Sequence, residues 1–324
     1  MGSGGQPQQP AGSPQDTGLP TAADIHAAAA RIAGKVRRTP VLTVGPGEIA
    51  PAGAVLKLEL LQYSGSFKAR GAFNRLLTAD VPRAGVIAAS GGNHGLAVAH
   101  AARTLAVPAE VFVPESTPAV KVDRLRAYGA EVTVTGAFYA DALEASERRR
   151  AETGALLVHA YDQPAVVAGQ GTVAVELETQ AQMDTVLVGV GGAGLIGGIA
   201  TWLGGRVRVV GVEPAACPTL YAALGAGHPV DVGVGGVAAD SMGARRVGEL
   251  GFAAAQHFVD RVVLVEDEAI VAAQRSLWSV CRLVAEPGGA AAVAALASGA
   301  YQPDADERVA VVVCGSNTDP ASVA

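Results

Sequence analysis

One lysine, Lys68, stands in a turn of small residues that leads into an alanine-rich segment. An exposed lysine has a pKa of about 10.4, so it is protonated at neutral pH and is a poor nucleophile. Lysine becomes a useful reagent when it is buried or held as an imine, and either state needs a pocket. Ser64, Ser66 and the ring of Phe67 lie beside Lys68 and indicate such a pocket. Taken alone, however, this segment is better explained by a solvated lysine at the start of a helix.

A second turn, residues 88–95, follows a strand-like run and opens another alanine-rich segment. Helix N-termini present unpaired N–H groups and partial positive charge, so they hold anions such as carboxylates. Ser90 alone is explained equally well as a helix N-cap. Asn93 and His94 are polar residues just inside a buried helix start, where they need hydrogen-bonding partners. His94 by itself fits a structural hydrogen-bonding residue better than a base.

The third turn, residues 186–198, joins a strand to a helix through a glycine-rich loop and predicts a phosphate cradle. The same loop satisfies another pattern, because Gly189, Gly191 and Gly194 fit G-x-G-x-x-G. Glu213 ends the next strand, about where a ribose-binding acid would stand. A nicotinamide-dependent dehydrogenase is therefore the rival hypothesis. It leaves Lys68 and the turn at 88–95 without a role.

A fourth turn follows the last strand-like run, at residues 311–319. Ligands of open parallel sheets bind beyond the carboxyl ends of the strands, so Cys314 is placed to face one. Taken alone, Cys314 fits a small core residue. The segment 286–289, Glu-Pro-Gly-Gly, fits a simple helix cap.

Short β-branched runs alternate with helical patterns from residue 22 onward, which is typical of parallel sheets covered by helices on both faces. An opening helix is expected from the apolar spacing of Ile25, Ala28 and Ile32. Four runs precede residue 161 and the others follow it, so we expect an α/β protein with two open, mostly parallel, twisted sheets. The predicted strands are 85–89, 109–113, 131–134, 156–160, 185–190, 207–212, 261–265 and 308–313.

Composition narrows the class of protein. The chain of 324 residues has room for two domains, and with 50% hydrophobic and 17% charged residues it is globular. Its net charge of −6 argues against nucleic acid or an anionic membrane as a partner. No apolar run is long enough for a membrane span, and the N-terminus lacks the features of a signal peptide. The three cysteines have no metal-type spacing, which favours a reduced, cytoplasmic protein.

Taken together, the four turns resemble the serine/threonine dehydratases (ammonia-lyases). These are pyridoxal-phosphate-dependent enzymes of fold type II, the tryptophan synthase β-subunit-like group. The resemblance runs from about residue 25 to residue 319, with the motifs in the family's order and spacing. Further matches are found at residues 37–40, Lys121, 128–132, 169–172, 212–214 and 286–287.

The resemblance implies a role for each motif. Lys68 would hold pyridoxal 5'-phosphate as a Schiff base and act as the catalytic base, with Phe67 against the pyridine ring. Asn93 would bond the ring hydroxyl, and Cys314 would face the pyridine nitrogen. The phosphate would be held by the backbone of Gly191, Gly192, Ala193, Gly194 and Leu195, and the substrate carboxylate by Ser90, Gly91, Gly92, Asn93 and His94. Ser90 is also implied to be catalytic.

Several positions depart from the family pattern. Gly91 stands where racemases of the family carry a second serine, so racemisation is not expected. Ala193 replaces a usual glycine, a mild change if its φ is negative. Leu96 replaces a common glutamine and makes the pocket less polar. Glu213 matches a cation site of some relatives but Thr219 is not acidic, so no metal is expected.

The expected activity is β-elimination from a 3-hydroxy amino acid such as L-threonine or L-serine, giving a 2-oxo acid and ammonia. The alternatives are β-replacement or another lyase reaction on the same scaffold, the dehydrogenase, and a non-catalytic amino-acid-binding protein. We expect a disordered tail at 1–20, a large cofactor-binding domain at 21–76 and 161–324, and a small domain at 77–160. A homodimer is expected from the family, and no C-terminal regulatory domain is expected after residue 319.

Overall fold

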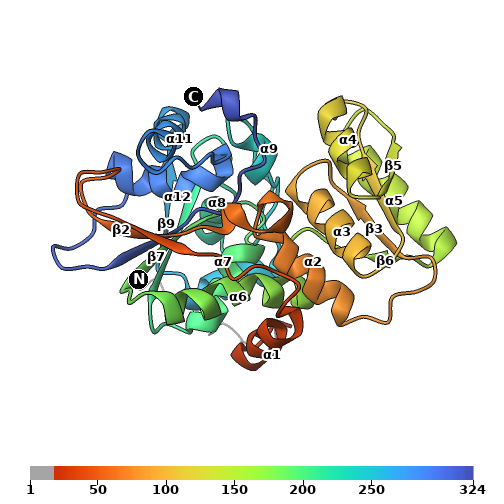
Figure 1. Cartoon of the computed structure of the whole chain (residues 1–324), viewed down its shortest axis with the longest axis horizontal. Helices are drawn as coiled ribbons and strands as arrows, with labels where there is room; N and C mark the ends of the chain where they lie inside the picture. Colours follow the sequence, from red (N-terminus) through yellow and green to blue (C-terminus); the bar gives the residue numbers. More distant parts are fainter. Residues whose placement is uncertain (1–17, 324) are drawn as a thin grey trace, which may run out of the picture.

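The computed structural model describes residues 18–323 and places two β-sheets side by side in an elongated molecule (Figure 1). Most of the predicted disordered tail, residues 1–17, lies outside the described residues. Leu19, at the end of that predicted tail, is buried and belongs to a small apolar cluster with Val167 and Leu250. Residues 18–20 are therefore part of the packed chain.

The larger sheet has six strands in the order β1-β2-β10-β7-β8-β9. Every neighbouring pair is parallel except β1 and β2, which form an antiparallel hairpin at one edge. The central strands are almost continuous runs of buried valine and leucine, as expected for a sheet covered on both faces. The strands are β1 (Val41–Val44), β2 (Ala54–Lys57), β7 (Thr185–Gly189), β8 (Arg208–Pro214), β9 (Arg261–Val265) and β10 (Val309–Val312).

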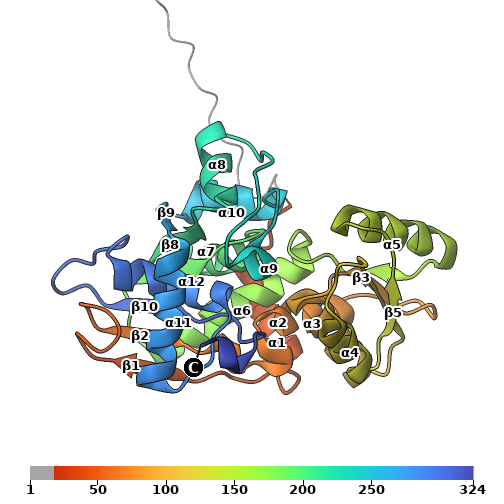
Figure 2. The same ribbon diagram turned by 90° about the horizontal axis from the view of Figure 1, so that it is seen from above.

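Two groups of helices cover the larger sheet (Figures 1 and 2). Side chains alternate along a strand, so Leu187 packs into the core under α11 and α12, whereas Val186 and Val188 pack into the core under α6, α7, α8 and α10. These helices are α6 (Pro164–Gln180), α7 (Gly194–Leu203), α8 (Thr219–Ala226), α10 (Glu249–Phe258), α11 (Asp267–Cys281) and α12 (Pro287–Ser298).

The smaller sheet has four parallel strands in the order β5-β4-β3-β6. Leu96 of α3 and Leu125 of α4 share one apolar cluster with Val111, whereas Ala142 of α5 packs with Ile87 on the other face. The strands are β3 (Val86–Ala89), β4 (Ala109–Val113), β5 (Glu131–Val134) and β6 (Leu156–Leu157), and the helices are α3 (Asn93–Thr104), α4 (Ala119–Ala127) and α5 (Tyr139–Thr153).

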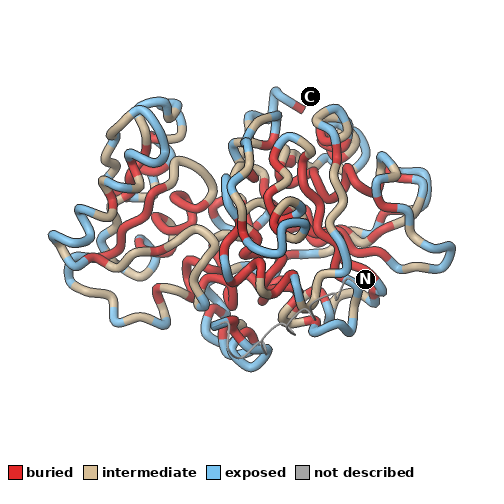
Figure 3. Tube along the Cα trace, turned by 180° about the vertical axis from the view of Figure 1, so that it is seen from behind, coloured by how far each residue is buried: buried red, intermediate tan, exposed pale blue. Residues whose placement is uncertain are grey.

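Helix α2 (Lys68–Leu77) lies where the two sheets meet, packed against α3 and α6. Buried backbone runs through both lobes and through the region that joins them (Figure 3). The remaining elements are α1 (Ala22–Ile32), α9 (Ala239–Met242) and the short 3₁₀ turns Glu59–Leu61, Tyr63–Gly65 and Pro320–Ser322. Within residues 18–323, no helix is both long and apolar enough to span a membrane.

The expected fold class, two mostly parallel sheets flanked by helices, is confirmed. Sequence periodicity did not reveal the hairpin β1–β2, because its strands have four residues each and β1 is a half-exposed edge strand. Strand β6 is shorter than the predicted run 156–160 and ends at Leu157. We propose domain boundaries near residues 76 and 160, because the smaller sheet takes all its strands from between them.

Candidate active site

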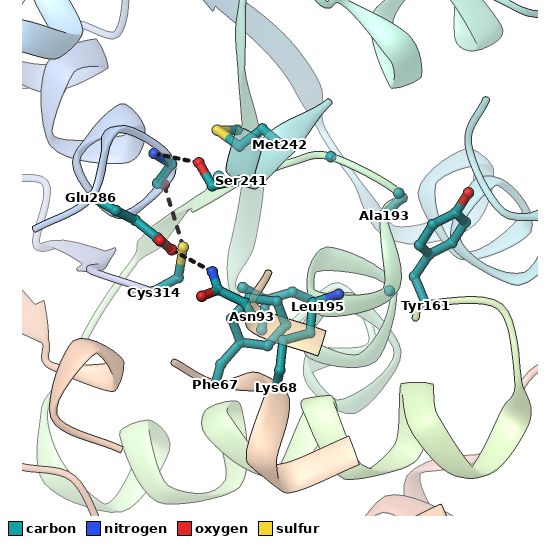
Figure 4. A pocket seen from close by; sticks show the side chains of 15 residues that line it. Phe67, Lys68, Asn93, Tyr161, Ala193, Leu195, Ser241, Met242, Glu286 and Cys314 are labelled. Atoms are coloured by element: carbon teal, nitrogen blue, oxygen red, sulfur yellow. Dashed lines mark hydrogen bonds between the residues drawn. The ribbon is translucent and has the colours of Figure 1, made fainter. Parts of the chain in front are cut away.

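A cavity lies between the two sheets, where several strands and helices present their ends (Figure 4). Its wall combines the start of α2, the start of α3 and the loops that follow β7 and β10, as expected for the carboxyl edge of parallel sheets. The lining residues are Phe67, Lys68, Asn93, Tyr161, Gly189, Gly191, Gly192, Ala193, Gly194, Leu195, Ser241, Met242, Glu286, Gly288 and Cys314.

Lys68 is the first residue of α2, and the loop before it is fixed to the larger sheet. Ser66 forms a β-bridge with Gly315, and the backbone N–H of Phe67 donates to the carbonyl of Cys314 at 3.1 Å. Lys68 Nζ donates to the carbonyl of Ala160 at 2.7 Å and lies 5.1 Å from the centre of the Phe67 ring. The lysine side chain is therefore held inside the cavity and is not a solvated helix start.

The serines beside Lys68 shape its loop and do not line the cavity, contrary to the expectation from sequence. Ser64 has a φ of 59°, so it turns the chain in the left-handed region. The hydroxyls of Ser64 and Ser66 are buried and have no hydrogen-bond partner among the described residues.

A buried ionic cluster fixes helix α2 just below the lysine. Arg70, which is fully buried, binds both carboxylate oxygens of Glu59 at 2.7 and 2.8 Å. It also reaches Glu176 of α6 at 2.8 Å, and Glu176 pairs in turn with Lys57 of β2 at 2.7 Å. The cluster therefore ties α2 to α6 and to the larger sheet.

Burial lowers the pKa of Lys68 to about 8, and the nearby Cys314 and Glu286 act in the opposite direction. No carboxylate among the described residues lies within ion-pair distance of its amine. Roughly one molecule in ten therefore holds a neutral amine at pH 7, far more than for an exposed lysine.

This shift predicts how the amine reacts in cofactor-free protein. Burial disfavours the charged form, so Lys68 should lose its proton about two units below an exposed lysine. Competitive labelling with acetic anhydride should show the rate at Lys68 rising with pH to a plateau with a midpoint near 8. Exposed lysines such as Lys35 provide the comparison within the same sample. A midpoint near 10 for Lys68 would contradict the assignment.

The loop between β7 and α7 forms a cradle of backbone N–H groups. The first N–H groups of a helix have no partner within it, and the helix dipole adds partial positive charge there. A Cβ at Gly191 or Gly194 would come within 2.8 Å of the backbone oxygens of Met242 and Tyr161, and a Cβ at Gly192 would overlap the Tyr161 ring. The loop can therefore approach its neighbours closely only as glycine, which suits a phosphate.

Ala193 has a φ of 64°, so the condition under which its replacement of glycine would be mild is not met. A left-handed alanine costs about 1–2 kcal/mol. Its methyl group is buried and faces Gly251, where a Cβ would lie 2.6 Å from that of Ala193. The strain therefore persists because α10 carries a glycine opposite the methyl group.

The turn before α3 places Ser90 and Asn93 on the smaller-sheet side. Gly92 is the N-cap of α3, so the explanation of Ser90 as N-cap is wrong. The Ser90 hydroxyl instead accepts from the N–H of Gly92 at 3.2 Å. His94 is buried and its Nε2 lies 2.7 Å from the carbonyl of Val158, while burial lowers its pKa to about 3. The His94 ring is therefore neutral and structural, and only its backbone N–H is left to serve a carboxylate.

Asn93 connects the two halves of the cavity through its side-chain amide. Its Nδ2 donates to Glu286 Oε1 at 2.6 Å, and its Oδ1 accepts from Asn317 Nδ2 at 2.6 Å (Figure 4 shows the first bond). Burial raises the pKa of Glu286 to about 7, although the bond from Asn93 acts against this shift.

Cys314 lies at the end of β10, as the sequence predicts, with its thiol in the cavity wall. The thiol donates to the carbonyl of Gly288 at 3.3 Å, and burial raises its pKa well above the ordinary range. Cys314 is therefore a neutral thiol that offers a weak hydrogen bond and no charge.

The structure adds Tyr161, Ser241, Met242 and Glu286 to the site. Glu286 was quoted as a match in the sequence but was explained as a helix cap. It is the N-cap of α12, but its side chain does not cap the helix and faces Asn93 instead. Tyr161 and Met242 carry no chemical signal in the sequence, and only packing places them against the glycine loop.

The geometry of Glu213 argues against the dehydrogenase. Its carboxylate is fully buried and accepts from the N–H groups of Leu220 and Tyr221 at 2.7 and 2.8 Å. It caps α8 and is not free to bind a ribose. Among the described residues, no group of His, Cys, Asp and Glu is arranged to hold a metal ion.

Comparison with known proteins agrees with this geometry. Residues 32–315 match the family profile described as "Pyridoxal-phosphate dependent enzyme". A phenylserine dehydratase of Ralstonia pickettii is 38% identical over 315 residues, which is 95% of this chain and 96% of the relative. An L-threonine ammonia-lyase of Geobacter sulfurreducens is 41% identical over 274 residues, or 82% of this chain and 68% of the relative.

The fold is also similar to solved structures. The crystal structure of a threonine deaminase from the organism abbreviated T.th. has a TM-score of 0.87 and 38% sequence identity. The similarity covers 93% of this chain and 99% of the threonine deaminase chain.

Proposed function

Because this chain belongs to the family of pyridoxal-phosphate-dependent enzymes, we propose that it eliminates water from a 3-hydroxy amino acid to give a 2-oxo acid and ammonia. The observation that carries the proposal is the position of Lys68. Its buried amine, with a lowered pKa, faces a cavity that has a glycine cradle on one side and a helix N-terminus on the other.

The residues present fit the cofactor. The cradle of Gly191, Gly192, Ala193, Gly194 and Leu195 would hold its phosphate, since the loop offers N–H donors and no carboxylate. Lys68 would hold its aldehyde carbon, and Phe67 would lie against its ring. Asn93 would bond the ring hydroxyl, and the neutral thiol of Cys314 would face the ring nitrogen. Pyridoxal phosphate, when bound, binds an amino group covalently and withdraws electrons from the substrate's Cα.

The protein's own groups then bind the substrate and move one proton. The N–H groups at the start of α3, with Ser90, Gly91, Gly92, Asn93 and His94, would hold the substrate carboxylate. The neutral amine of Lys68 would accept the proton from Cα, and the pair of electrons left there would expel the β-hydroxyl as water. Hydrolysis of the released enamine gives the 2-oxo acid and ammonia.

Gly91 supports elimination over racemisation. It has no side chain to protonate the opposite face of the substrate, and a Cβ there would lie 2.9 Å from the Thr117 methyl group. Leu96 lies in the wall of a smaller adjoining cavity, together with Lys121, Arg124 and Asp240. That cavity is therefore polar despite Leu96, contrary to the expectation from sequence.

Assembly and location complete the proposal. We propose a homodimer, as expected from the family, and a reducing, cytoplasmic setting. All three cysteines are free, which supports the second point. The substrate is a small amino acid, and the acidic net charge supports the absence of nucleic acid as a partner.

A substrate panel tests the proposed reaction. L-serine, L-threonine and 3-phenylserine should each be assayed for 2-oxo acid and ammonia, with and without an added thiol. We expect equal amounts of both products from at least one of them, independent of the thiol. A product that requires the thiol would indicate β-replacement, and turnover of none would contradict the proposal.

A further inference from the structure

Asn317, in the turn that follows β10, joins three segments that meet at the cavity. Its Nδ2 donates to the carbonyl of Ser64 at 2.7 Å and to Asn93 Oδ1 at 2.6 Å. Its Oδ1 accepts from Arg124 Nη2 at 2.6 Å. Ser64 belongs to the loop that carries Lys68, Asn93 begins α3, and Arg124 lies on α4. One amide therefore contacts the lysine loop of the larger lobe and two helices of the smaller lobe.

These hydrogen bonds fix the orientation of two amides in series. Arginine has only donors and a backbone carbonyl is only an acceptor, so Asn317 must turn its Oδ1 to Arg124 and its Nδ2 to Ser64. The same Nδ2 then meets Asn93, so Asn93 must present its Oδ1 to Asn317. This leaves Asn93 Nδ2 directed at Glu286 and at the cavity.

The space around Asn317 allows little freedom. Gly65 has a φ of 79°, and a Cβ there would lie 2.6 Å from Asn317 Oδ1. Arg124 makes no ion pair with a carboxylate of residues 18–323, so Asn317 is the one side chain that accepts from its guanidinium there. Arg126, on the same helix, pairs only weakly with Asp123 at 3.6 Å, and both of these side chains are exposed.

We propose that Arg124 and Asn317 are positioning residues that set the Asn93 amide with its Nδ2 toward the cofactor when α4 lies against the larger lobe. The proposal rests on the proposed function only in its assignment of Asn93 to the cofactor. It makes the fit of the cofactor depend on contact between the lobes, because Arg124 belongs to the smaller lobe and Asn317 to the larger.

The variant Asn317→Asp separates positioning from simple bridging between the lobes. Aspartate keeps the volume and pairs better with Arg124, but it loses the donor to Asn93. Titration of cofactor-free protein with pyridoxal phosphate, followed by absorbance, should show Kd raised about tenfold or more. A Kd equal to or below that of the parent protein would overturn the proposal. This readout needs no turnover, so failure of the dehydratase assay would not affect it.

Arg124→Met and Arg126→Met form a matched pair on the same helix. We expect the first to raise the cofactor Kd about fivefold and the second to leave it unchanged. Adding Arg124→Met to Asn317→Ala should then have no further effect, because the relay is already broken. Equal effects of the two arginine variants, or independent effects in the double variant, would overturn the proposal. This pair decides the question if Asn317→Asp does not fold.

Discussion

Replacing Lys68 with alanine is expected to lower the rate of 2-oxo acid formation by at least about a thousandfold. Among the described residues, Lys68 contributes the only amine in the cavity wall, and we assign it both the covalent link to the cofactor and the transfer of the Cα proton. The fold should survive, because the side chain makes a single hydrogen bond, to the carbonyl of Ala160. Ammonia release and the visible absorbance of the purified protein measure the loss.

Lys35→Ala is the matched control, since Lys35 is exposed and lies outside the cavity. It should retain both the absorbance and the activity of the parent protein. Turnover by the Lys68 variant within tenfold of the parent, with a normal melting temperature, would contradict the assignment of the base.

The largest effect on stability is expected from Arg70→Met. Arg70 is fully buried and neutralises Glu59, which is also fully buried. Removing one partner of a buried ion pair leaves an uncompensated charge and costs about 3–5 kcal/mol. Because the cluster also ties α2 to Glu176 of α6, the variant should also bind the cofactor less tightly. Urea denaturation of the cofactor-free variant measures the change in free energy of unfolding.

Arg148→Met provides the control for this prediction. Arg148 pairs with Glu144 at 2.5 Å along α5, but both side chains are exposed, so its loss should cost about 0.5 kcal/mol or less. Equal destabilisation by the two variants would show that burial of the Arg70 cluster has no energetic consequence.

Much of the site could be predicted from sequence because parallel sheets bring the carboxyl ends of their strands together. The turns after β3, β7 and β10 carry Asn93, the glycine cradle and Cys314, and the structure places all of them in one cavity wall. A glycine loop or a polar turn is a local signal, and its position at a strand end follows from the alternation of strands and helices.

The remainder depends on contacts between residues far apart in the chain. Glu286 acquires its role from Asn93, 193 residues away, and Asn317 acquires its role from Arg124, also 193 residues away. Each of these side chains is ordinary within its own segment. The left-handed Ala193 is likewise explained only by Gly251 on a different helix.

The sequence also predicted roles that the structure assigns differently. Ser64 and Ser66 resemble pocket residues because they are polar and adjacent to Lys68, but they shape the loop behind it. His94 has the chemistry of a base, but it points at a backbone carbonyl in the core. Residue type alone does not reveal the direction of a side chain.

Borohydride reduction of the purified protein, followed by peptide mapping, tests the central claim most directly. A reduced pyridoxyl group should be found on the peptide that contains Lys68, in a yield equal to the bound cofactor. The Lys68→Ala variant should carry no such group. A label on any other lysine, or no label on protein that holds the cofactor, would contradict the account.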